Sequence, residues 1–162
     1  MLREIRDLGF DHAELSHGIR ISLLPGIFEA VAAGEIKISS LHNFCPLPVG
    51  VTTASPNLFK FTALDPRERE SAYKHSLKTI EMAGRVGAAV VALHLGCGEM
   101  KDYTEKLVDL VAAGKQDSPK YASLCLEVLE KREAQKERHS DFADGILTGL
   151  SKEAELRGVR LG

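Results

Sequence analysis

The chain has 162 residues, the length of a single domain with room for a substantial core. Its net charge is -2 with both signs interspersed, so the composition gives no general attraction to nucleic acid or to an anionic membrane. No apolar run approaches the roughly 20 residues of a membrane span, and the N-terminus lacks a signal-peptide core, so we expect a cytoplasmic protein. Three cysteines, an odd number, favour reduced thiols.

Helices and strands alternate in the first half of the chain. Apolar residues at helical spacing predict helices over 1–8 and 24–34, and glycines end both. Short stretches of small and β-branched residues predict strands at 12–15 and 36–42. The stretch 43–64 contains three prolines and several apolar residues, which predicts a long loop packed over other parts of the chain.

The second half continues the alternation. An Asp-Pro-x-Glu start predicts a helix over 65–87. The run 88–95 has no alternating polar residues, which predicts a strand buried on both faces, as in a parallel sheet covered by helices. A short helix is predicted at 102–113, and a long or once-bent helix with a solvated, charged middle at 118–157. Residues 158–162 are typical of the start of another strand.

Strands that alternate with helices imply parallel strands joined by right-handed crossovers. We therefore predict an α/β fold, a partial (β/α)8 TIM barrel of about four parallel strands with flanking helices. A complete barrel needs about 250 residues. We expect residues 1–162 to form one partial domain that lacks the first strand and the C-terminal half of the barrel.

Three predicted strands end on polar, titratable residues, namely Glu14, His42 and His94. The carboxyl ends of parallel strands meet at one face of a barrel, where its chemistry is found. A carboxylate and two imidazoles there can hold a divalent metal, orient sugar hydroxyls or transfer protons. Taken singly, each histidine also fits a structural role and Glu14 fits a surface carboxylate. Two histidines on neighbouring strands favour a site.

Two further patterns follow the same strands. Segments 42–45 and 94–97 both read His-x-x-Cys, which leaves a tetrahedral zinc site as an alternative to buried cysteines. Cys125 is expected in the core. Gly96 and Gly98 match neither GxGxxG nor a P-loop, so we expect them to let the backbone turn tightly beside a ligand.

Four segments, LREIRDLGFDHAELS, ISSLHNFCP, AGRVGAAVVALHLG and AELRGVRLG, together resemble the xylose isomerase-like TIM barrel superfamily. This superfamily includes sugar phosphate isomerases/epimerases and, more distantly, type-four AP endonucleases. The resemblance covers essentially the whole chain, in the right order. It implies a divalent metal (Mn, Mg, Co or Zn) in the complete protein, held in the isomerase branch by residues of later strands. Most metal ligands are therefore expected outside this chain, and whether it binds a metal alone stays open.

By this resemblance, Glu14, His42 and His94 bind substrate, a small sugar or polyol that undergoes metal-assisted isomerisation or epimerisation. Whether this chain is itself an enzyme is left open. In one alternative, an endonuclease IV-like phosphodiesterase acting on abasic DNA, His42 and His94 are zinc ligands. The net charge and the lack of Lys or Arg near these histidines count against it. In the other, the chain is a non-catalytic truncated half-barrel, whose exposed edges favour a homo-oligomer.

Overall fold

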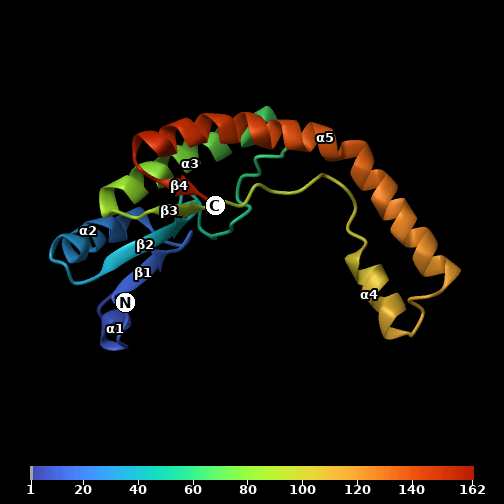
Figure 1. The fold of residues 1–162 in the computed structure, drawn as a ribbon, viewed down its shortest axis with the longest axis horizontal. Helices are drawn as coiled ribbons and strands as arrows, with labels where there is room; N and C mark the ends of the chain where they lie inside the picture. The colour runs from blue at the N-terminus through green and yellow to red at the C-terminus, as the bar shows by residue number, and fades with distance from the viewer. Residues whose placement is uncertain (1) are drawn as a thin grey trace.

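The computed structural model describes residues 2–162, and its elements alternate in the predicted order (Figure 1). The helical segments are α1 Leu2–Asp7, the 3-10 turn η1 Ile21–Leu23, α2 Leu24–Ala32, α3 Pro66–Val86, α4 Thr104–Ala112 and α5 Pro119–Leu156. The strands are β1 His12–Leu15, β2 Lys37–His42, β3 Val90–Ala92 and β4 Arg160–Leu161. The predicted helix over 1–8 is confirmed from residue 2, and Met1 lies outside the described residues.

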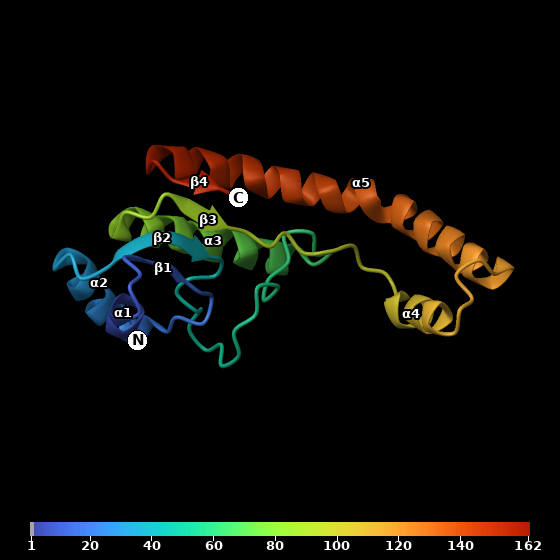
Figure 2. The ribbon, with the colours of Figure 1, turned by 60° about the horizontal axis from the view of Figure 1, so that its bottom comes forward.

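The four strands form one parallel sheet in the order β1-β2-β3-β4. Its register aligns one row of apolar residues, because Leu15 pairs with Leu41, Leu41 with Val91, and Val91 with Leu161. The first three of these side chains are almost completely buried. They belong to the core between the sheet and the helices, with α3 and α5 covering this face (Figure 2). The predicted partial barrel of four parallel strands is confirmed.

The opposite face of the sheet is open. Val90 and Ala92 of β3 are only half-buried, and Glu14 of β1 is exposed. The expectation of a strand over 88–95 buried on both faces is therefore wrong in its length and in its burial. The burial is lower than expected because, among the described residues, helices cover only one face of the sheet (Figure 2). In a closed barrel the open face would be the interior.

Local chemistry explains the bounds of α3. The Asp65 side chain accepts a hydrogen bond from the backbone N–H of Arg67 (2.8 Å), and Pro66 takes the first helical position. Gly87 ends the helix with φ +71°, a left-handed conformation that glycine adopts without strain. The start and end predicted for this helix are confirmed.

The long segment after β2 is packed, as predicted. Phe44 and Phe61 are fully buried in the core. The Asn43 side chain, also fully buried, donates to Ser76 Oγ (2.8 Å) and accepts from Thr79 Oγ1 (2.9 Å). Both partners lie on α3. Residue 43 and the end of β2 are therefore fixed to this helix.

The long helix α5 has two different halves. Its buried residues, His139, Ala143, Leu150 and Ala154, all lie in the C-terminal half, which packs on α3. The N-terminal half projects away from the sheet together with α4 (Figures 1 and 2). We call residues 103–138 the arm. The expectation that Cys125 lies in the core is wrong: it is half-buried on the arm, where α4 packs against α5.

Despite this length, no helix within residues 2–162 combines the size and the apolar character needed to cross a membrane.

Candidate functional site

Three histidines gather where the first three strands end. His42 is the last residue of β2, and its ring lies 4.9 Å from that of His94, which follows β3. The ring of His17, which follows β1, lies 5.1 Å from that of His42 (centroid to centroid). The structure thus brings the two predicted histidines together and adds a third. His17 lies two residues beyond β1, as His94 lies two residues beyond β3, but the predicted strand 88–95 included His94, so this shared offset is visible only in the structure.

Glu14 lies on the same open face of the sheet, one strand away from His42. Its carboxylate accepts a hydrogen bond from Ser40 Oγ (2.6 Å). Because Ser40 is two residues before His42 on β2, both side chains point to the same side of the sheet. Glu14 is therefore held beside β2 through Ser40 rather than by a hydrogen bond to either predicted histidine.

The histidines influence each other's protonation. Partial burial lowers the pKa of His17, and the neighbouring His42 and His94 lower that pKa further, since a second positive charge nearby is unfavourable. Nδ1 of His17 is buried and has no hydrogen-bond partner among residues 2–162. A neutral imidazole carries one donor and one acceptor nitrogen. The shielded Nδ1 cannot reach a ligand in this arrangement, so any hydrogen bond between His17 and a ligand hydroxyl would be made by Nε2.

The pKa of His17 gives a direct test of this cluster. We expect the His17 ring to titrate below its ordinary value of about 6.5. Replacing His42 with glutamine removes one source of repulsion, so the pKa of His17 should rise toward 6.5. Proton NMR of the imidazole Cε1–H signals over pH 4–8 measures both values. An unchanged pKa of His17 in the variant would show that the two rings are not coupled.

The described residues do not form a metal site by themselves. No group of three or more His, Cys, Asp or Glu in residues 2–162 has the arrangement to hold a metal ion. Cys45 is buried in the core, and this burial raises the pKa of its thiol to about 12, whereas Cys97 is exposed. The zinc alternative based on the two His-x-x-Cys segments is therefore not supported.

The glycine-containing turn after His94 is tightly packed. Gly96 has φ +100°, and a Cβ atom there would lie 2.7 Å from Thr62 Oγ1 and 2.8 Å from Lys60 Cβ. Thr62 Oγ1 in turn donates to the carbonyl oxygen of Cys97 (2.8 Å). Only glycine fits this position, which confirms the predicted tight turn.

A fourth histidine, His139 of α5, fastens this turn to the helix. The His139 side chain is buried, and its Nδ1 lies 2.5 Å from the carbonyl oxygen of Thr62. Its Nε2 accepts a hydrogen bond from the backbone N–H of Glu99 (3.3 Å). The proton must therefore be on Nδ1. A cavity of about 480 Å³ lies beside it, lined in part by Cys97 and Lys136. The charged stretch around His139 predicted only a solvated helix face, so this role was missed.

Comparison with known proteins gives the fold a wider context. No family model and no curated protein matches the sequence. The solved structures that are similar at probability 1.00 include 3-keto-D-glucoside 4-epimerase YcjR from E. coli (TM-score 0.62, 12% identity), D-psicose 3-epimerase with D-tagatose from Clostridium cellulolyticum H10 (0.55, 14%) and a xylose isomerase domain protein from Planctomyces limnophilus (0.52, 14%).

Each of these matches covers 99% of this chain but only 48%, 44% and 47%, respectively, of the other protein. The chain thus spans less than half the length of the structures it matches. At these identities the similarity establishes the fold. The chain has the fold of about half of a TIM barrel, like the corresponding half of these structures.

Proposed function

We propose that this chain provides the substrate-orienting side of a sugar isomerase or epimerase site. The observation that carries the proposal is the row of imidazoles from His17, His42 and His94 at the carboxyl ends of three parallel strands. Catalytic groups of TIM barrels lie at this end. Similarity to sugar epimerases and to a xylose isomerase domain protein supports the choice of substrate class.

The ligand would be a small sugar in its ketose form, or a related polyol or sugar phosphate. Its hydroxyl groups are donors and acceptors at once, which matches neutral imidazoles. His42 and His94 would hold neighbouring hydroxyls, and His17 would complete the row through its Nε2. Glu14, held by Ser40, would line the same face and accept a hydrogen bond from a further hydroxyl group of the sugar.

A proton or hydride shift on such a sugar needs polarisation of its carbonyl, which a divalent metal (Mn, Mg, Co or Zn) supplies in metal-dependent isomerases. The described residues do not form such a site alone. We propose that residues 1–162 are one partial barrel domain without the first strand and the C-terminal half. On this proposal, metal ligands come from strands that close the barrel.

Calorimetric titration of the chain with D-psicose and D-tagatose, with and without Mn²⁺, tests this function. The His42→Gln and His94→Gln variants should each weaken binding roughly 3- to 10-fold, the effect of losing one hydrogen bond of about 0.5–1.5 kcal/mol. His12→Gln is the matched control, because His12 lies at the opposite, amino end of β1.

Three outcomes would overturn the proposal. They are an absence of sugar binding at millimolar concentration, equal weakening by His12→Gln, and binding of a duplex with an abasic site in place of the sugar. The last would favour the phosphodiesterase alternative.

A further inference from the structure

The arm, residues 103–138, lies outside the packed body of the protein. Neither α4 nor the first 20 residues of α5 contains a fully buried side chain. The main packing partner of α4 is α5, and both views show the pair projecting from the sheet (Figures 1 and 2). The arm therefore adds little to the core of its own chain.

Apolar side chains are exposed on both helices of the arm. They are Val108 and Val111 on α4, and Leu126 and Leu129 on α5, each between 50% and 59% exposed. Each pair is spaced three residues apart, so its members are neighbours on one side of their helix. Half-buried residues such as Leu107 and Leu124 lie on a different side of each helix, which we infer is the side that faces the other helix.

The two exposed pairs belong to the same side of the arm. An α-helix turns by about 100° per residue. On each helix, the exposed pair therefore lies roughly a quarter to a third of a turn around the helix axis from the side that faces the partner helix, in the same direction on both helices. The two helices run in roughly opposite directions (Figure 1). In such a hairpin, equal rotations bring residues to a common face, so the four side chains form one apolar surface, which we call the arm face.

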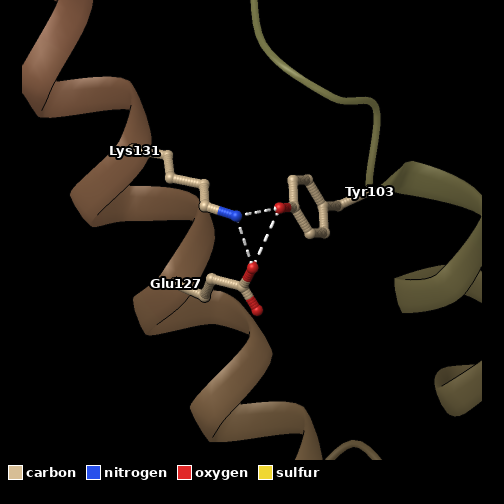
Figure 3. A network of polar contacts seen from close by, with 3 residues as sticks. All are labelled: Tyr103, Glu127 and Lys131. Carbon is tan, nitrogen blue, oxygen red and sulfur yellow. Dashed lines mark hydrogen bonds and ion pairs between the residues drawn. The ribbon is translucent and has the colours of Figure 1, made fainter.

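A polar network holds the arm in a defined shape (Figure 3). Tyr103 is buried, and its hydroxyl donates to Glu127 Oε1 (2.9 Å) while accepting from Lys131 Nζ (2.5 Å). Lys131 also donates to Glu127 Oε1 (2.6 Å). These contacts lower the pKa of Glu127 and raise that of Lys131, so both groups stay charged at neutral pH. The start of α4 is thereby fixed to α5, and the arm face is preorganised.

The charge of the arm restricts its partner. Residues 103–138 contain seven basic and seven acidic side chains in an interspersed pattern, so the arm has no net charge. A nucleic acid or an anionic membrane would require a cationic surface. A neutral surface with both signs does not repel a second copy of itself, and its charges can pair with those of that copy.

We propose that the arm face is a dimerisation surface, on which the arms of two copies pack around a two-fold axis. The arm part of α5 is about 30 Å long, whereas α4 has 9 residues and is about 14 Å long, and each helix is about 10 Å wide. One face therefore offers on the order of 450 Å² per copy, which is below the roughly 800 Å² per partner of a standard interface and is the size expected of a weak dimer. In such an isologous contact, Leu126 and Leu129 of one copy meet the same arm face of the other. This inference is independent of the proposed sugar site.

Light scattering coupled to size-exclusion chromatography tests it, with protein loaded at about 1 mM because an interface of this size is expected to be weak. The unmodified chain should elute as a species of twice 17.7 kDa. Leu126→Lys combined with Leu129→Lys should elute as a monomer, because the dimer dissociation constant should rise at least tenfold. Val108→Lys combined with Val111→Lys should do the same. Because all four side chains are exposed in a single copy of the chain, the substitutions should not disturb its folding, and circular dichroism should show unchanged helix content.

Two controls separate this surface from others. Leu8→Lys changes an even more exposed leucine outside the arm and should leave the dimer intact. Val90→Lys places a charge on the open sheet face, through which half-barrels would otherwise associate. A monomeric unmodified chain would overturn the proposal. So would a dimer that Val90→Lys dissociates while both arm variants leave it intact.

Discussion

Replacing Leu150 with alanine should lower the free energy of unfolding by about 2–5 kcal/mol. Leu150 is completely buried in the half of α5 that packs on α3, and it belongs to the main core cluster. Truncation removes apolar contacts and leaves a cavity that the surrounding side chains fill only partly. Urea unfolding followed by circular dichroism measures the change.

Leu156→Ala is the matched control, because the same substitution is made in the same helix at a side chain that is 78% exposed. Its effect should stay within about 0.5 kcal/mol. Equal effects of the two substitutions would mean that the C-terminal half of α5 is not packed on the body of the protein as described.

Asn43→Ala should lower the free energy of unfolding by about 2–3 kcal/mol. The substitution removes the buried hydrogen bonds to Ser76 and Thr79, and each buried polar group left without its partner costs about 1–3 kcal/mol. Ser76 and Thr79 retain bonds to carbonyl oxygens of α3, which limits the loss. Since Asn43 follows His42 directly, the variant should also weaken sugar binding at the strand ends.

A double-mutant cycle with Thr79→Val isolates the contact from the general cost of each substitution. We expect a coupling energy of about 0.5–3 kcal/mol between the two positions. Asn57→Ala, at an exposed position in the same long segment, should have little effect. Strictly additive effects of Asn43→Ala and Thr79→Val would contradict the described network.

The sequence was most informative where a pattern repeats locally. Strand alternation with helices predicted the parallel order, and Asp65 and Gly87 predicted both ends of α3. Burial of the strand around Val91 was predicted less well. An uninterrupted apolar run is typical of a strand that is buried on both faces, as in a closed barrel. Within residues 2–162, however, helices cover only one face of the sheet.

Contacts between distant segments could not be predicted from local patterns. His139 is separated by 77 residues from Thr62, to which it bonds, and its charged neighbours suggest solvent. His17 joins His42 only because β1 and β2 pair in a particular register. The division of α5 into a packed half and an arm likewise depends on which helices lie beside it, because the charged middle predicted from the sequence does not indicate which half is packed.

A crystal structure of the chain soaked with D-psicose would test the central claim most directly. We predict a sugar at the carboxyl ends of β1 to β3, with hydroxyl oxygens about 2.6–3.2 Å from ring nitrogens of His42 and His94. A sugar bound elsewhere, such as in the cavity beside His139, with the three strand-end imidazoles free of it, would contradict the account.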